Sequence, residues 1–268
     1  MPSGRFELIC EVEPAARPDL AAVRQQVGVM TPVASAFLIP DNHLGRASVS
    51  SIAVAHEVAA MGSEAIACVN SRDRNRLGFR RDLLTAAAYG VERFLFVYGD
   101  DPESGRRAHD LNVRTMLDEV RTFGSSEAFT GRPRFRLGVT SRLSLLPGWK
   151  RDADFLLVQA TFDLEGLFRW RDTLGFEGPV YAGVLVVASA PMAKTLQAAT
   201  HQISVPETLI ENLDRDRDAG IDAACTLLET IKDSGAFDGV HLIPVGRFRE
   251  VAARLEALGF RRPNRAAD

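Results

Sequence analysis

The stretch that decides the fold is residues 64–101, EAIACVNSRDRNRLGFRRDLLTAAAYGVERFLFVYGDD. Its first seven residues form a short apolar run, which is typical of a strand buried on both faces. Apolar residues then recur at helical spacing over 76–89, where Asn75 is placed to cap the start of the helix and Gly90 to end it. The run ERFLFVYG follows as a second buried strand. The order strand, helix, strand predicts a parallel βαβ unit.

Polar side chains gather where both of these strands end. They are Asn70, Arg72, Asp73 and Arg74 after the first strand, and Asp100 and Asp101 after the second. A parallel unit brings both carboxyl ends to the same edge of the sheet, which is where α/β folds build their sites. We expect Asp73 of this group, together with Asn75, to have a structural role in salt bridging and helix capping.

The rest of the chain repeats the alternation of strands and helices. Further strands are predicted over 6–12, 33–39, 134–139, 155–159, 180–187 and 239–244. Helices are predicted over 18–27, 48–61, 106–123, 164–174, 191–200, 206–233 with a break near 215–220, and 248–258. Eight short strands alternating with helices predict an α/β fold with one (β/α)8 TIM barrel domain over 1–268, and a doubly wound open sheet is the alternative.

Two segments depart from a regular barrel. The residues between the fifth and sixth predicted strands are too few for a normal crossover, so the helix there is either reduced to a turn or missing. The final residues, 261–268, are expected to form a flexible tail.

Composition narrows the class of protein. With 46% hydrophobic and 25% charged residues and a net charge of −3, the chain is typical of soluble globular proteins, and no basic block suggests a nucleic-acid partner. Three widely spaced cysteines and an N-terminus unlike a signal peptide predict reduced thiols in a cytoplasmic protein. The longest apolar stretch, 180–190, is too short to span a membrane.

In a barrel, the polar residues at the strand ends converge on one mouth. They are Glu11, Glu13, Asn42, His43, Arg72, Asp73, Arg74, Asp100, Asp101, Thr140, Arg142, Gln159, Asp163 and Arg247. The other histidines are scattered and indicate no metal site, and the chain has neither a GxSxG motif nor a glycine-rich nucleotide fingerprint. What remains is acid–base chemistry on a bound organic ligand.

Five segments, in order along nearly the whole chain, resemble the catalytic barrel of methylenetetrahydrofolate reductases. They are CEVEPA, VNSRDRNRLGFRRDLLTAAAYGVERFLFVYGDDP, LLVQATFD, YAGVLVV and HLIPVGR. The resemblance implies an oxidoreductase of one-carbon metabolism and methionine biosynthesis. Such enzymes reduce 5,10-methylenetetrahydrofolate to 5-methyltetrahydrofolate with electrons from NADH or NADPH.

The resemblance also implies roles for single residues. Glu11 aligns with the general acid that protonates N10 of the folate, so that the ring opens and an iminium carbon accepts hydride. Asp100 aligns with an aspartate beside the pterin, and Gln159 with a glutamine that hydrogen-bonds it. Phe162 is expected to form a wall of the folate site or to lie in the core. Arg247 is expected to meet a phosphate or carboxylate of a substrate or to form a surface salt bridge.

The segment LGVTSRLSLLPGWKRDAD departs from the family, because flavin-dependent members carry a Y-P-E-x-H-P-E loop and a further helix there, which hold the flavin. We therefore expect direct hydride transfer from the nicotinamide without tightly bound FAD. The alternatives are a flavin-dependent reductase with an altered FAD pocket, a non-redox folate-dependent methyltransferase or demethylase, and a folate-binding partner subunit. Glu13 replaces an apolar family residue, and it is expected to face solvent, to pair with an arginine or to lie beside Glu11.

Overall fold

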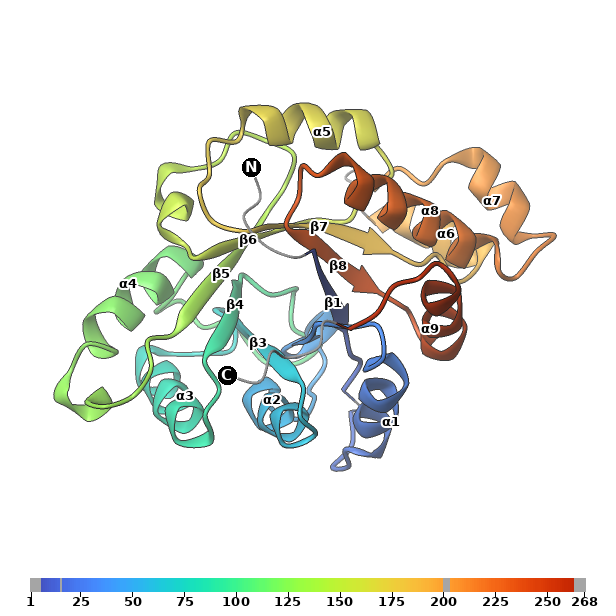
Figure 1. Ribbon diagram of the computed structural model, residues 1–268. Coiled ribbons are helices and arrows are strands. Elements are labelled where there is room, and N and C mark those ends of the chain that lie inside the picture. Colours follow the sequence, from blue (N-terminus) through green and yellow to red (C-terminus); the bar gives the residue numbers. More distant parts are fainter. Residues whose placement is uncertain (1–5, 15, 200–202, 263–268) are drawn as a thin grey trace.

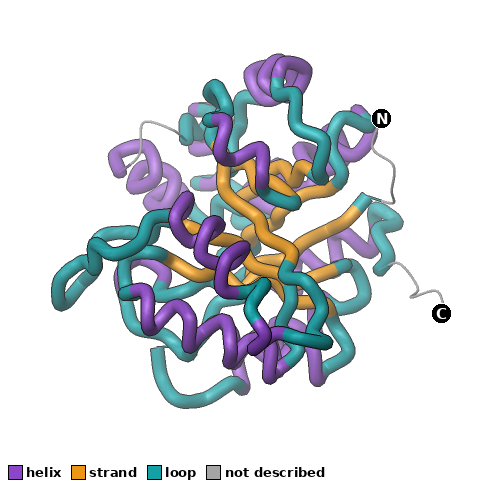
Figure 2. Tube along the Cα trace, turned by 90° about the vertical axis from the view of Figure 1, so that its left-hand side faces the viewer, coloured by secondary structure: helices purple, strands orange, loops and turns teal. Residues whose placement is uncertain are grey.

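The structure is a computed structural model that describes residues 6–14, 16–199 and 203–262 (Figure 1). Eight parallel strands pair in chain order, and β8 pairs with β1, so that the sheet closes into a barrel. Helices surround the strands, which run through the centre of the molecule (Figure 2). The predicted (β/α)8 barrel is confirmed, and a doubly wound open sheet is excluded.

The elements have the following bounds. The strands are β1 (Glu7–Glu11), β2 (Ala36–Ile39), β3 (Glu64–Asn70), β4 (Arg93–Val97), β5 (Arg136–Ser141), β6 (Phe155–Val158), β7 (Val180–Leu185) and β8 (Gly239–Ile243). The α-helices are α1 (Ala21–Met30), α2 (Ser51–Ala60), α3 (Arg76–Tyr89), α4 (Val113–Phe123), α5 (Leu164–Thr173), α6 (Ala190–Ala199), α7 (Glu207–Leu213), α8 (Ala219–Ser234) and α9 (Phe248–Ala257). Three short 3₁₀ helices are η1 (His43–Gly45), η2 (Glu127–Phe129) and η3 (Gly148–Asp152).

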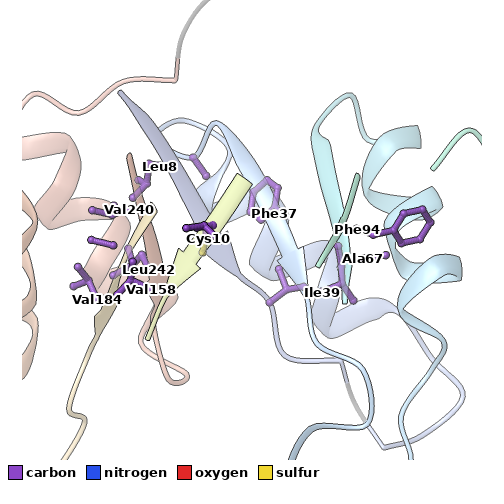
Figure 3. Packing of buried hydrophobic residues seen from close by; sticks show 14 of the residues in the cluster. Leu8, Cys10, Phe37, Ile39, Ala67, Phe94, Val158, Val184, Val240 and Leu242 are labelled. Carbon is purple, nitrogen blue, oxygen red and sulfur yellow. The ribbon is translucent and has the colours of Figure 1, made fainter. Parts of the chain in front are cut away.

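Alternate residues of each strand serve two separate apolar layers. Leu8 and Cys10 belong to the large cluster between the strands and the helices, part of which Figure 3 shows. Ile9 belongs to a smaller cluster with residues of the other strands, and this cluster fills the barrel interior. Because successive side chains of a strand point to opposite faces, Glu11 shares the inward face of Ile9. The alternation of side chains along β1 therefore directs Glu11 into the barrel interior.

The βαβ unit that decides the fold forms as predicted. α3 spans Arg76–Tyr89, and the Asn75 side chain accepts a hydrogen bond of 2.8 Å from the backbone N–H of Gly78. Gly90 ends the helix with a φ of 68°, a left-handed conformation that suits glycine. The capping role of Asn75 and the terminating role of Gly90 are confirmed.

One predicted helix begins too early. The prediction of a helix over 106–123 is wrong in its first part, because α4 starts at Val113. Asn112 and Thr115 form a reciprocal capping box that sets this start. The preceding segment is held to the strand ends instead: Arg107 donates to the backbone oxygens of Tyr98 and Gly99. Contacts to neighbouring loops replace the helical hydrogen bonds there.

Other predicted boundaries differ from the observed ones by three residues or fewer. β5 begins at Arg136 rather than 134, where its pairing with β4 starts, and it extends to Ser141, which pairs with Val158 of β6. The predicted reduction of the crossover after β5 is confirmed, since η3 is the helical element between β5 and β6 in the described chain. Of the predicted tail over 261–268, residues 263–268 lie outside the described residues, and Arg262 donates to the backbone oxygen of Gly62.

Candidate functional site

A cavity of about 1010 Å³ opens at the end of the barrel where the strands finish. Seven of the residues predicted at the barrel mouth line it, and three of them, Glu11, Asp100 and Gln159, lie at the ends of β1, β4 and β6. The other four are Asn42, His43, Thr140 and Arg142. The cavity floor is formed by inward side chains of the barrel, among them Cys68 and Leu157. The position matches the face on which (β/α)8 barrels carry their sites.

Glu11 faces His241 across the joint between the first and last strands. Barrel closure sets Ile9 of β1 opposite His241 of β8, and Oε2 of Glu11 lies 3.1 Å from Nε2 of His241. The side chains are 15% and 9% exposed. The arrangement lacks hydrogen-bond geometry, which leaves Nε2 of His241 without a hydrogen-bond partner among the described residues. A buried polar atom of this kind is open to a ligand or a proton donor.

Sequence reasoning missed His241, which it treated as one of several scattered histidines. The pattern GVHLI contained a usable indication, because His241 is a polar residue inside an apolar strand and shares its inward face with Ile243, which also lines the cavity. Only barrel closure brings β8 beside β1.

Asp100 is fixed by one backbone donor and one side-chain donor. Its Oδ2 accepts a hydrogen bond of 3.0 Å from the backbone N–H of Leu44, and its backbone oxygen accepts from Arg72. The neighbouring Asp101 has a fully solvent-exposed side chain that pairs with Arg107 at 3.3 Å. Asp100 therefore lines the cavity, whereas Asp101 belongs to the outer loop.

Gln159 is anchored through its backbone and leaves its amide available. Its backbone N–H donates to the oxygen of Ser141 at 2.9 Å, which continues the β5–β6 ladder beyond the end of β6. Its side chain is exposed to the cavity and makes no hydrogen bond within the part of the chain that the structure describes. An amide can both donate and accept, which suits the edge of a heterocycle.

A network of ionic and amide groups ties the loop after β2 to the loop after β3. The Arg72 side chain is 1% exposed, and its guanidinium binds both carboxylate oxygens of Asp73. Asn42 and Asn70 donate to the same carboxylate at 2.8 and 2.9 Å. Partial burial alone would raise the pKa of Asp73, but the hydrogen bonds from Arg72, Asn42 and Asn70 lower that pKa well below its usual value. This is the structural cluster that the sequence indicated for Asp73.

Three further residues lie outside the cavity lining. Arg247 forms salt bridges with Asp218 and Glu250 at the surface, which is the second of the two roles predicted for it. Phe162 packs at the edge of the apolar cluster formed by α6, α7 and the end of β7. The carboxylate of Glu13 accepts a hydrogen bond of 3.0 Å from the backbone N–H of Gly246, so it points to the loop after β8 and away from Glu11.

Basic residues line the part of the cavity formed by α4, the end of β5 and η3. They are Arg114, Arg142 and Lys150. Lys150 donates to the backbone oxygen of Thr140 at 2.6 Å. Burial, together with the nearby charge of Arg142, lowers the pKa of Lys150. Of the three, sequence reasoning had named only Arg142.

The described residues contain neither a cluster of metal ligands nor a membrane-spanning helix. Within 6–14, 16–199 and 203–262 there is no group of three or more histidine, cysteine or acidic side chains that could hold a metal ion. In the same ranges no helix has the length and apolar character needed to cross a bilayer. The three cysteines are buried as free thiols.

Comparison with known families confirms the resemblance noted in the sequence. The family described as methylenetetrahydrofolate reductase matches residues 147–259. This span contains the segments LLVQATFD, YAGVLVV and HLIPVGR, whereas the two N-terminal segments that resemble the family lie outside it. No curated protein matches the chain in sequence.

Solved structures share the fold. An uncharacterized protein from Clostridium thermocellum, described as binding two copies of 5-methyl-5,6,7,8-tetrahydrofolic acid, superposes with a TM-score of 0.66 at 11% identity. The match covers 95% of this chain and 96% of that one. The EDTA monooxygenase EmoA from Chelativorans sp. BNC1 has a TM-score of 0.52 at 9% identity, with 96% and 95% of the chains covered. The long-chain alkane monooxygenase LadA has a TM-score of 0.57 at 11% identity, with 98% and 94% covered. At these identities the likeness concerns the fold alone.

Proposed function

We propose that the protein reduces 5,10-methylenetetrahydrofolate to 5-methyltetrahydrofolate, and the match of residues 147–259 to the methylenetetrahydrofolate reductase family supports this proposal. The hydride donor is NADH or NADPH, and the hydride passes directly from the nicotinamide to the folate. The observation that carries the proposal is the position of Glu11. This carboxyl lies in the same cavity as Gln159 and Asp100, is largely buried and stands 3.1 Å from His241.

The chemistry requires one proton and one hydride. Glu11 gives a proton to N10 of the folate, the bond between N10 and the bridging carbon breaks, and an iminium forms between that carbon and N5. Hydride from the dihydronicotinamide then adds to the carbon, which yields the N5-methyl group and oxidised nicotinamide. Because His241 lies within reach of the Glu11 carboxyl, it can return a proton to Glu11 after turnover.

Gln159 and Asp100 orient the folate in this scheme. The free amide of Gln159 meets the donors and acceptors at the pterin edge. Asp100 is held by the backbone of Leu44 and therefore offers a carboxylate in a fixed position. Holding two ring systems in contact is itself a large part of such catalysis, because it replaces a bimolecular encounter. A cavity of about 1010 Å³ has the capacity for both rings.

The residues present do not fit a tightly held flavin. The connection from β5 to β6 contains η3 in place of the loop and helix that hold FAD in flavin-dependent members. The loops after β7 and β8 are a common phosphate site in barrels of this type, yet the N–H of Gly246 in the loop after β8 is already bound by Glu13. Both observations favour direct transfer over a flavin route.

A second candidate is a folate-binding protein or methyltransferase that performs no redox step. It is favoured by the structural neighbour from Clostridium thermocellum, whose description names 5-methyl-5,6,7,8-tetrahydrofolic acid as a bound ligand. In that case the cavity would bind 5-methyltetrahydrofolate as donor or product, and Glu11 would serve as a hydrogen-bonding group rather than as an acid.

The deciding experiment is anaerobic oxidation of NADH and NADPH by the purified protein with methylenetetrahydrofolate and without added flavin. The visible spectrum is recorded in the same cuvette. Turnover by a colourless protein supports direct hydride transfer. A yellow protein, or turnover that begins only when FAD is added, would refute the flavin-free route. Absence of turnover in both conditions, with 5-methyltetrahydrofolate still bound, would favour the non-redox candidate.

The acid is tested by Glu11→Gln, with Glu13→Gln as the matched control. The first change removes the proton donor and keeps the shape, so turnover should fall by about 100-fold or more while folate binding persists. The second removes a carboxylate two residues away that lies outside the cavity lining, and turnover should remain near that of the wild type. If Glu11→Gln and the wild type turn over at the same rate, Glu11 is not the acid.

A further inference from the structure

The cavity lining carries a cluster of cations that the proposed chemistry does not use. Arg114 lies in the first turn of α4, Arg142 directly follows β5, and Lys150 lies in η3. All three line the same cavity as Glu11. They come from three separate segments of the chain, so the tertiary fold brings them to one cavity. We refer to these three residues as the cationic wall.

Among the described residues, no acidic group forms an ion pair with the cationic wall. The side chains of Arg114 and Arg142 have neither an ion pair nor a hydrogen bond to any described residue. Lys150 donates to the oxygen of Thr140, which is a neutral acceptor. The charge of Arg142 acts unfavourably on Lys150, and an anion bound between them would relieve this repulsion.

The acidic groups in the same cavity are already engaged elsewhere. Asp41 binds Arg74 at 2.6 Å, Asp100 accepts from the backbone of Leu44, and Glu11 faces His241. The cavity is thus divided by charge. Carboxylates cluster at the ends of β1, β2 and β4, and uncompensated cations stand along α4, the end of β5 and η3.

The shortened crossover holds Lys150 in place. The N–H of Lys150 donates to the oxygen of Pro147, and Arg151, the next residue, donates to the backbone oxygens of Leu174 and Gly175 after α5. η3 is therefore closed by its own turn hydrogen bond and is attached to the loop after α5 through the Arg151 side chain. A lysine on an anchored turn loses little further freedom when it binds a charged group.

We propose that Arg114, Arg142 and Lys150 form an anion subsite that binds the multiply charged tail of a substrate, so that its ring is directed into the barrel. This inference rests on the proposed function. The shared chemistry is a pair of neighbouring anionic groups, which two substrates supply: the diphosphate of the nicotinamide dinucleotide and the glutamate carboxylates of the folate. Pairing of oxyanions with arginine and lysine is charge-assisted and is weakened by salt.

The test measures equilibrium binding, so that it does not depend on turnover. The ligands are NADH and 5-methyltetrahydrofolate carrying one or three glutamates, each at low and high salt. The variants are Arg114→Gln, Arg142→Gln and Lys150→Gln. The matched control is Arg136→Gln, because Arg136 is exposed at the opposite end of the strand that leads to Arg142 and has no side-chain partner in the described chain.

Each wall variant should bind the relevant ligand about tenfold or more weakly than the control, and the difference should shrink at high salt. Weaker NADH binding with unchanged folate binding assigns the subsite to the diphosphate. Weaker binding of the triglutamate form alone assigns it to the folate tail. Arg114 and Arg142 are exposed, so their variants should fold and keep the test valid if Lys150→Gln does not fold.

Two outcomes contradict the inference in different ways. If the wild type binds both ligands and all wall variants match Arg136→Gln, the anion subsite is wrong while the proposed function stands. If the wild type binds neither ligand, the proposed function is wrong, and the anion subsite that rests on it is wrong as well.

Discussion

Replacing Asp73 by asparagine tests the network that supports the site. The change keeps the size of the side chain and removes its charge. In the wild type the carboxylate accepts four side-chain hydrogen bonds, two from Arg72 and one each from Asn42 and Asn70. An asparagine oxygen can accept about two of these, and its NH₂ group would face donors. About two donors therefore lose their partner.

The expected cost follows from those two donors. An unpaired donor costs about 1–3 kcal/mol. Because the Arg72 side chain is only 1% exposed, water cannot hydrate its guanidinium in place of the lost carboxylate. The Asp73 side chain is 26% exposed, which lets water replace part of what is lost. We expect Asp73→Asn to lower the free energy of unfolding by about 3 kcal/mol. For a chain of this size that corresponds to a Tm lower by about 6–12 °C.

The assay is urea denaturation followed by circular dichroism, with Asp101→Asn as the control. Asp101 is in the neighbouring loop with a fully exposed side chain, and its replacement should change stability by less than about 0.5 kcal/mol. If Asp73→Asn is as stable as the control, the carboxylate does not support the buried Arg72 and the reasoning fails.

Acid should remove the same contribution from the wild type. The pKa of Asp73 is lowered in the folded state, so the carboxylate stabilises the fold above its unfolded pKa, near 4. That contribution is lost as the pH falls from about 4 towards the lower folded value. The stability gap between the wild type and Asp73→Asn should therefore narrow below about pH 4, and a constant gap would contradict this account.

Two further predictions concern the barrel and its thiols. A Cβ at Gly138 would collide with the ring of Phe155, so Gly138→Ala should destabilise the fold by about 1–3 kcal/mol in thermal melts. Gly148→Ala, where a Cβ meets open space, is its control, and equal melts would refute the collision. Burial raises the pKa of the Cys225 thiol to about 11 and that of Cys68 well above its usual value. Iodoacetamide at pH 8 should therefore label both far more slowly in the native than in the unfolded protein, and equal rates by mass spectrometry would show that the thiols are accessible.

The fold was largely predictable because its information is local. The period of apolar residues identified the eight strands, and Asn75 and Gly90 marked the ends of α3 through their own side-chain and backbone preferences. The early start predicted for α4 was wrong because contacts with distant loops, rather than local preferences, decide where that helix begins. Arg107 and its neighbours have ordinary helical propensity, but contacts to the loops after β3 and β4 hold them outside the helix.

The amino-acid sequence by itself determined the class of fold, the reduced connection after β5 and the placement of Glu11, Asp100 and Gln159 at strand ends. These depend on alternation and spacing along the chain, which packing does not alter. Only the tertiary structure decided which strand ends face one another. Closure of the barrel places His241 3.1 Å from Glu11, although more than two hundred residues separate them, and the short turn of η3 places Lys150 beside Arg142. Such pairings depend on register and closure around the barrel, and no local pattern encodes them.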